Sequence, residues 1–190
     1  MLPVSQRAHS ITLPQGSQLA GIRFHPGISF GIFGHRYDKP AALTDCTLLF
    51  EFQALAHHLS NTLGHHARIV VLYKWLNRVI DFSGVIPTPL SLALNVMSDT
   101  QSLSLLSRDI PLSQRQIERQ FQKWMGMTPK QYQRILRVKK TLHFLKHNLD
   151  TDLVELAHDN GFSDQAHMTR EFKQIAKITP GRYSKLVARR

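Results

Sequence analysis

Apolar residues recur at helical spacing through the middle of the chain. From Thr44, a residue suited to cap a helix, to about Ser60 they fall on one side of a helix. A second helix is predicted from about Ala67 to Phe82. Its apolar residues nearly surround it, so we expect most of it to be buried.

The first 40 residues follow another pattern. Five glycines separate short apolar pieces, of which residues 21–24 and 28–33 are the clearest. Such pieces predict short strands or a hairpin. Residues 1–84 are therefore expected to form a small α+β unit, and the stretch 83–89, with two prolines and a glycine, to be a linker or loop.

Residues 85–190 have a helical pattern and contain an internal repeat. Residues 106–113 match residues 156–163 at an offset of 50, whereas Phe121 matches Phe172 at an offset of 51. A Thr-Pro pair follows each copy, also at an offset of 51. The repeat is too short for a solenoid and indicates a duplicated supersecondary unit with one residue added in the second copy.

Each copy has the parts of a helix-turn-helix, which we place at about residues 102–125 and 151–176. Ser113 and Ser163 are suited to cap the second helix of each copy. Gly161 fits the second turn because glycine adopts a positive φ without penalty. The residues predicted to point inward are Ile117, Phe121, Met168 and Phe172.

A single long helix is predicted between the copies. Pro129 suits its first turn, and apolar residues at helical spacing continue to about Asn148. Twenty residues give about 30 Å of helix, against about 34 Å for one turn of B-DNA. A spacer of that length could hold two recognition helices in successive major grooves.

Charge narrows the class of partner. The chain has 24 Lys and Arg against 13 Asp and Glu, a net charge of +11. Residues 85–190 hold 17 and 9 of these, a net +8. Such an excess indicates an anionic partner, a nucleic acid or a membrane surface. The alternative is that the charge only keeps the protein soluble.

Composition argues against several other classes. The single cysteine, Cys46, excludes an internal disulfide framework and a multi-cysteine zinc site. We recognise no signal peptide at the N-terminus, and apolar runs such as residues 68–76 are broken by charge. We therefore expect a cytoplasmic, nucleoid-associated protein with no membrane segment. No catalytic constellation is evident, so an enzyme is not expected.

The second copy carries a specific resemblance. Residues 156–173, with Thr179-Pro180 and Tyr183, resemble the DNA-binding domain of the AraC/XylS family of bacterial transcription regulators. The first copy and the helix between the copies add Ser113, Arg115, Ile117, Arg119, Phe121, Gly126, Thr128-Pro129 and Arg137. The resemblance covers about residues 88–187 and implies two helix-turn-helix units joined by a long helix. The expected fold is thus mainly α.

Three residues depart from the family pattern. Pro111 stands where the first turn usually has glycine, and since proline cannot adopt a positive φ, that turn must have another geometry. Ser107 replaces an alanine, and Met168 replaces a phenylalanine whose place it can fill.

The exposed side of each second helix carries the residues expected to read bases. They are Gln114, Arg115, Glu118 and Arg119 in the first copy and Gln165, Ala166, Thr169 and Arg170 in the second. Arginine suits guanine, glutamine suits adenine, and alanine suits a thymine methyl group. Expected phosphate contacts are Lys123, Arg134, Lys173 and Arg182. For His167 we favour a structural role.

The first unit leaves several alternatives open. The pairs His57-His58 and His65-His66 could hold a metal, but adjacent helical residues rarely share one ion, so no metal site or other cofactor is assigned. The predicted helix 67–82 carries Ile69, Leu72, Leu76 and Val79 at coiled-coil spacing. It could form a homodimer or pack in the core. Residues 1–84 are short for the effector domain that the family often carries, so no small-molecule effector is named.

We read the chain as a sequence-specific DNA-binding transcription regulator, an activator by resemblance. Its partners would be double-stranded promoter DNA and RNA polymerase. The first alternative is a basic architectural protein that binds DNA without sequence preference. The second is a histidine-based metal sensor or enzyme.

Overall fold

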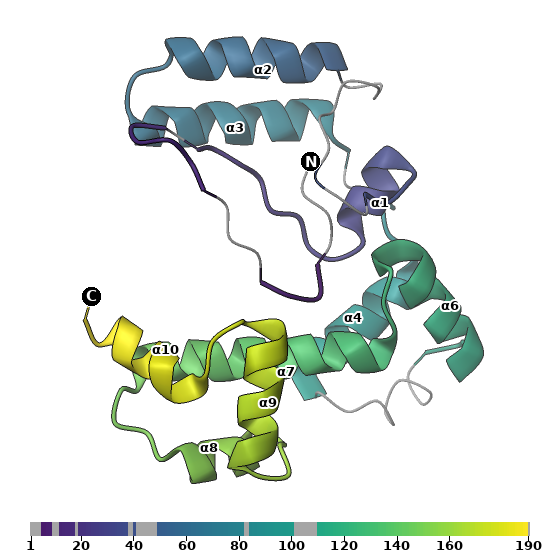
Figure 1. Cartoon of the computed structure of the whole chain (residues 1–190). Coiled ribbons are helices and arrows are strands. Elements are labelled where there is room, and N and C mark those ends of the chain that lie inside the picture. Colours follow the sequence, from purple (N-terminus) through teal and green to yellow (C-terminus); the bar gives the residue numbers. More distant parts are fainter. Residues whose placement is uncertain are drawn as a thin grey trace. The chain divides into compact units, whose positions relative to one another are not determined.

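The computed structural model describes residues 5–8, 12–17, 19–37, 40, 49–81, 84–100 and 110–189. Every regular element within these ranges is a helix, so the expected mainly α fold is confirmed (Figure 1). The helices are α1 (Ile28–Phe33), α2 (Leu49–Asn61), α3 (His65–Val79), α4 (Thr88–Thr100), α6 (Gln114–Met125), α7 (Pro129–His147), α8 (Leu153–Asp159), α9 (Gln165–Ile175) and α10 (Pro180–Val187). Among these residues, none of the helices is both long and apolar enough to cross a membrane.

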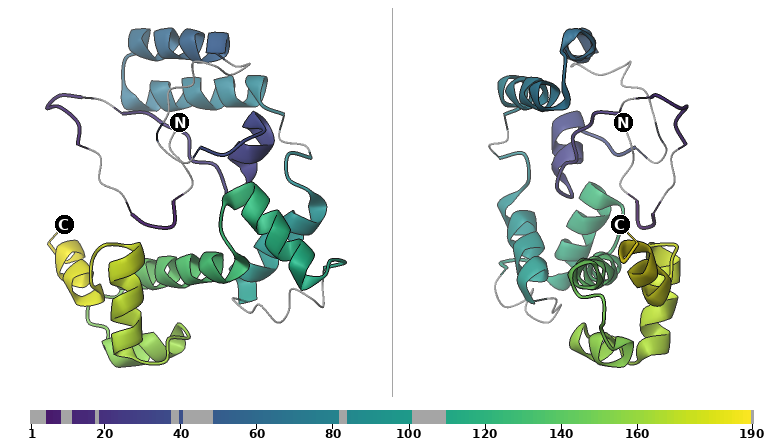
Figure 2. Two further views of the ribbon diagram at one scale, coloured as in Figure 1. Left: turned by 45° about the vertical axis from the view of Figure 1, so that its right-hand side comes forward. Right: turned by 90° about the vertical axis from the view of Figure 1, so that its left-hand side faces the viewer.

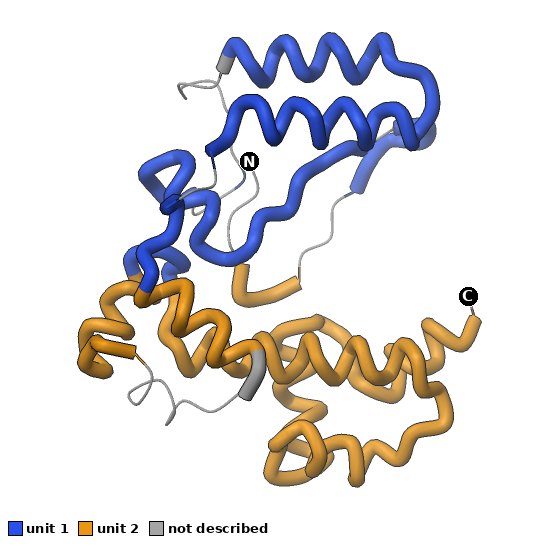
Figure 3. The backbone as a smooth tube through the Cα atoms, turned by 180° about the vertical axis from the view of Figure 1, so that it is seen from behind, with its two compact units in different colours: residues 1–4, 11–88, 123–126 blue, residues 5–10, 89–122, 127–190 orange. Residues whose placement is uncertain are grey.

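The chain divides into two compact units (Figure 3). Unit 1 holds residues 1–4, 11–88 and 123–126, and unit 2 holds residues 5–10, 89–122 and 127–190. The main division falls after Thr88, four residues beyond the boundary expected from composition. The proposed domain limits of 1–84 and 85–190 stay a prediction.

The strands predicted in the first 40 residues are wrong. Residues 21–24 have no regular structure, and residues 28–33 form helix α1. Gly27 and Gly34 flank this helix at φ values of 87° and 73°, and the Gly34 N–H donates to the Phe30 carbonyl. A run of six apolar and small residues satisfies both a strand and a helix pattern, so periodicity alone could not decide between them.

Helices α2 and α3 lie side by side as a hairpin in unit 1 (Figure 1). The Trp75 indole N–H donates to the Glu51 carbonyl, and the Trp75 ring packs 5.2 Å from the Phe52 ring. The expected start of α2 at Thr44 lies outside the described residues. The expected burial of α3 is wrong, since Ile69 is 62% exposed and Tyr73 67%. In unit 1 helix α2 covers one face of α3, so the apolar residues of the other faces stay exposed.

The first part of unit 2 is built from α4, α6 and α7. Helix α4 buries Leu90, Ala93 and Met97, which are spaced at one helix turn. Phe121 of α6 is fully buried and lies 5.9 Å from the Tyr132 ring of α7. Burial raises the pKa of the Tyr132 hydroxyl above its ordinary value, against a smaller opposite effect of its hydrogen bond with Ser98.

The second part of unit 2 surrounds a core of its own. Buried residues from α7, α8, α9 and the turn between α8 and α9 form it: Val138, Leu145, Leu156, Ala157, Phe162, Met168 and Phe172. Tyr183 of α10 packs against this core. The left view in Figure 2 shows α7 lengthwise as one continuous helix. The sequence prediction of a continuous helix from Pro129 is thus confirmed, and it ends one residue before Asn148.

The repeated Thr-Pro pair starts a helix in each copy. Thr128 caps α7 and forms a reciprocal capping box with Gln131, and Pro129 occupies the first turn. Thr179 caps α10, where its hydroxyl accepts from the Arg182 N–H. The pair repeats because both helices begin with the same local chemistry.

Candidate nucleic-acid interface

The second helix-turn-helix consists of α8, a glycine turn and α9. Gly161 has a φ of 70°, as the sequence predicts. The Phe162 N–H donates to the Ala157 carbonyl and the Gly161 N–H to the His158 carbonyl, which closes α8. The Phe162 side chain, 3% exposed, anchors the turn in the core.

Asp164, and not Ser163, caps the recognition helix α9. Its carboxylate accepts from the His167 N–H at 2.6 Å. That hydrogen bond is the main reason why the pKa of Asp164 lies below its ordinary value, with further lowering by the Ser163 hydroxyl and the Arg170 charge. The predicted cap at Ser163 is therefore wrong by one residue.

In the first copy the predicted cap at Ser113 is confirmed. The Ser113 hydroxyl accepts from the Gln116 N–H, and the Gln116 side chain accepts from the Ser113 N–H. Because α6 starts at Gln114 and α9 at Gln165, the residue added in the second copy is Asp164, in the turn before the helix.

The turn of the first copy has the different geometry expected from Pro111. The Leu112 N–H donates to the Ile110 carbonyl at 2.7 Å, a three-residue turn centred on the proline. The first helix of this copy, expected from about residue 102, and Ser107 lie outside the described residues.

The recognition helices separate a buried face from an exposed one. Met168 and Phe172 of α9 have no exposed surface, and Ile117 and Phe121 of α6 are 4% and 0% exposed. These inward positions are confirmed. On the other side the candidate base-reading residues are exposed, except for the half-buried Thr169.

Two of the candidate base-reading residues already bond each other. The Gln114 side-chain amide donates to the Glu118 carboxylate at 3.0 Å. This contact links the two side chains on the exposed face of α6.

Comparison with known proteins identifies this region. Residues 106–186 match the family described as "Helix-turn-helix domain". The HTH-type transcriptional activator RhaS of Salmonella paratyphi A is 25% identical over 181 residues, which are 94% of this chain and 56% of the relative. RhaS of Escherichia coli strain SE11 is 30% identical over 83 residues, which are 44% of this chain and 30% of the relative.

Residues 106–186 form a helix-turn-helix domain of the AraC/XylS type. The resemblance recognised in the sequence is thereby confirmed. The chain spans about half the length of the Salmonella relative, and the match covers 94% of the chain. No solved structure matches it.

The AraC/XylS-type domain exposes three of the four predicted phosphate contacts. Lys123, Lys173 and Arg182 are exposed. Arg134 instead turns its guanidinium to α9, where Nε lies 2.5 Å from Glu171 Oε1 and Nη2 donates to the Gln174 side chain. Its donors toward α9 are therefore used inside the protein.

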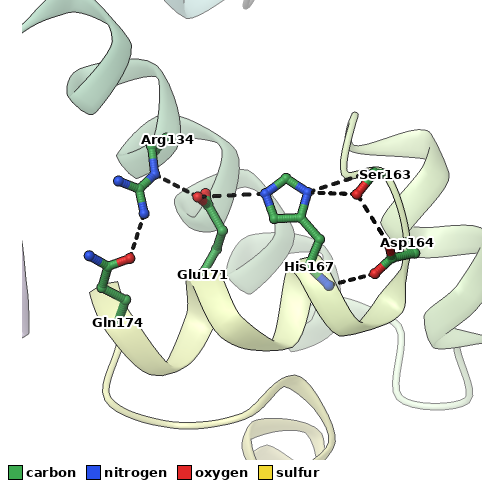
Figure 4. A network of polar contacts seen from close by, with 6 residues as sticks. All are labelled: Arg134, Ser163, Asp164, His167, Glu171 and Gln174. Atoms are coloured by element: carbon green, nitrogen blue, oxygen red, sulfur yellow. Dashed lines mark hydrogen bonds and ion pairs between the residues drawn. The ribbon is translucent and has the colours of Figure 1, made fainter.

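His167 takes part in the same polar network (Figure 4). Its Nδ1 accepts from the Ser163 N–H at 3.2 Å, and its Nε2 lies 3.7 Å from Glu171 Oε1. The Phe162 ring lies edge-on at 5.6 Å. These contacts agree with the structural role that we favoured for His167.

Sequence reasoning missed Glu171 and Gln174 in this network. A signal for Glu171 exists, because a charged residue between Met168 and Phe172 interrupts the apolar side of the helix. Arg137, which the resemblance singled out, lies on α7 with its guanidinium 5.2 Å from the centre of the Phe162 ring. It therefore holds the turn of the second copy by a cation–π contact.

The paired histidines His57-His58 and His65-His66 lie at the end of α2 and the start of α3, and all four are exposed. The His57 ring contacts the Asn61 side chain. Within the described residues, no group of three or more His, Cys, Asp or Glu side chains could hold a metal ion.

Proposed function

We propose that this protein is a sequence-specific regulator of transcription that binds double-stranded promoter DNA in the cytoplasm and activates RNA polymerase there. Residues 85–190 would form the DNA-binding domain and residues 1–84 a separate unit. The observation that carries the proposal is the two-sided α9, whose inner face is sealed in the core while Gln165, Ala166 and Arg170 are exposed at its N-terminal half. In a helix-turn-helix that half meets base edges.

The proposed base-reading residues are Gln114, Arg115, Glu118, Arg119, Gln165, Ala166, Thr169 and Arg170. Lys123, Lys173 and Arg182 would contact phosphates, which positions the protein without reading sequence. The length of α7, 19 residues or about 28 Å, suits recognition helices placed about one turn of DNA apart.

The activator role rests on the similarity to RhaS, at 25% identity. Transcription in vitro from a promoter that carries the selected site, with purified RNA polymerase, tests it. Added protein should raise the amount of transcript, and a fall would make the protein a repressor.

A homodimer through α3 belongs to the same proposal. Ile69 is 62% exposed and Val70 39%, so part of the apolar surface of α3 is available to a second copy. Sedimentation equilibrium at micromolar concentration should give the mass of a dimer, and Ile69→Glu should return it to the monomer. A wild-type monomer would refute the dimer and leave DNA reading untouched.

Selection of binding sites from a random duplex library tests DNA reading itself. The full chain should enrich one motif with two short blocks about 10 base pairs apart. Recovery of unenriched sequence would instead favour an architectural protein that coats DNA.

Variants of Arg170 and Lys173 make a matched pair that distinguishes base reading from phosphate contact. Arg170→Ala should weaken binding to the selected duplex by about 1–3 kcal/mol and leave a shuffled duplex of equal composition nearly unaffected. Lys173→Ala should weaken both equally and lower the salt dependence by about one counterion. Equal losses for Arg170→Ala would make Arg170 a phosphate contact.

A further inference from the structure

The Arg134 guanidinium joins the long helix α7 to the recognition helix α9. Nε pairs with Glu171 Oε1, and Nη2 donates to Gln174 Oε1, each at 2.5 Å. Glu171 and Gln174 are one turn apart on α9, so a single planar group holds α9 at two points. Two contacts from one planar group restrict rotation of α9 against α7 more than a single contact would.

The Glu171 carboxylate is buried where a neutral side chain would fit the core better. The residue is 6% exposed and lies between Met168 and Phe172. Among the described residues no donor reaches its Oε2. A buried ion pair of this kind rarely adds stability over an apolar replacement, and its best-attested benefit is a unique arrangement of the parts.

The polar contacts continue from Glu171 to the end of α9 that would enter the groove (Figure 4). His167 lies one turn before Glu171, and its Nδ1 accepts the Ser163 N–H, which leaves Nε2 to carry the proton that faces Glu171. The His167 backbone N–H donates to Asp164, the cap that directly precedes Gln165. The network therefore runs from Arg134 on α7 along α9 to its N-terminal end, where the proposed base-reading residues lie.

The first copy has neutral residues at the equivalent positions. At the offset of 51, Gln120 stands for Glu171 and Gln116 for His167. Gln116 closes the capping box of α6, and no described donor reaches the buried Gln120 Oε1. The charged contact between Arg134 and Glu171 is thus specific to the second copy and is not part of the repeated pattern.

We propose that Arg134 and Glu171 are positioning residues that set the orientation of α9 on α7 for sequence-specific reading. This proposal rests on the proposed function. It replaces the expected phosphate contact at Arg134, because the guanidinium acts through Glu171 and not on DNA. Loss of the pair would let α9 shift, which weakens base contacts while the surface charge that binds any DNA remains.

The test compares four variants of the full chain on the selected duplex and on its shuffled counterpart. Arg134→Met removes the contacts of the guanidinium with α9, and Arg134→Lys keeps the positive charge. Glu171→Gln removes the negative charge of the partner residue. Lys139→Met, at an exposed position of the same helix, is the control for the loss of one positive charge. Fluorescence anisotropy over a salt series gives both affinities, and circular dichroism confirms folding at the assay temperature.

Arg134→Met should lower the ratio of the two affinities at least tenfold, with the shuffled duplex bound within about twofold of wild type and an unchanged salt slope. Arg134→Lys should restore the ratio to within about threefold. Lys139→Met should leave the ratio unchanged.

Two results would overturn the proposal. Equal loss on both duplexes with a salt slope lower by about 0.9 would make Arg134 a phosphate contact. An unchanged ratio in folded Arg134→Met would make the pair merely structural. If Arg134→Met does not fold, the near-isosteric Glu171→Gln decides, since the proposal requires at least a threefold fall. A wild-type ratio near one would refute the proposed function, a separate outcome.

Discussion

Replacing Lys177 by glycine should stabilise the protein. Lys177 directly follows Ala176, the C-cap of α9, and has a φ of 60°. At the offset of 51 the first copy has Gly126, with a φ of 69°. The left-handed conformation costs a non-glycine residue about 1–2 kcal/mol, and glycine loses roughly 0.5–1 kcal/mol more backbone entropy on folding. The net gain for Lys177→Gly is about 0.5–1 kcal/mol.

Thermal unfolding of the full chain, followed by circular dichroism, measures this gain. In a domain of about 100 residues it corresponds to a rise in Tm of roughly 2–8 °C. Lys177→Ala is the matched control, because alanine removes the charge but keeps the Cβ that makes the conformation unfavourable. Equal stabilisation by both variants would trace the effect to the lysine charge and refute the argument from backbone strain.

Three further predictions follow from the packing and the caps. Thr128→Ala should cost about 1 kcal/mol in urea unfolding, because it removes the hydroxyl that accepts the Gln131 N–H in the capping box of α7. Leu145→Ala should cost about 2–5 kcal/mol, because Leu145 is fully buried, whereas Leu149→Ala, at a residue 48% exposed, should change stability by about 0.5 kcal/mol or less. Since the folded-state pKa of Asp164 is lowered, its cap should contribute its full stabilisation above pH about 5, and this stabilisation should be lost as the pH falls through the lowered pKa. Asp164→Asn should abolish this pH dependence of Tm. An unchanged dependence of Tm on acid pH in Asp164→Asn would contradict the assignment of the cap.

The second helix-turn-helix could be predicted because its signals are local. The positive φ of Gly161, the Thr-Pro helix start and the inward spacing of Met168 and Phe172 each depend on a few neighbouring residues. The exact cap could not be predicted as safely. Serine and aspartate cap equally well, and only the change of offset from 50 to 51 indicated an added residue.

Contacts between distant segments were beyond the sequence pattern. Arg134 and Glu171 lie 37 residues apart, and an exposed arginine that binds phosphate has the same local pattern as one that pairs inside the protein. The prediction that α3 is mostly buried failed for a related reason. Apolar residues on every face of a helix are covered only where other elements pack against those faces. At residues 28–33 the short apolar run fitted two periods, and the flanking glycines fit a helix as well as a hairpin.

The ratio of affinities for the selected and the shuffled duplex tests the central claim most directly. Measured with the full chain at about 150 mM salt, it should be at least about 10³, as sequence-specific DNA-binding proteins show. Equal affinity for both duplexes, with the same steep salt dependence, would contradict sequence-specific reading and leave only the charge of the protein to explain its binding to DNA.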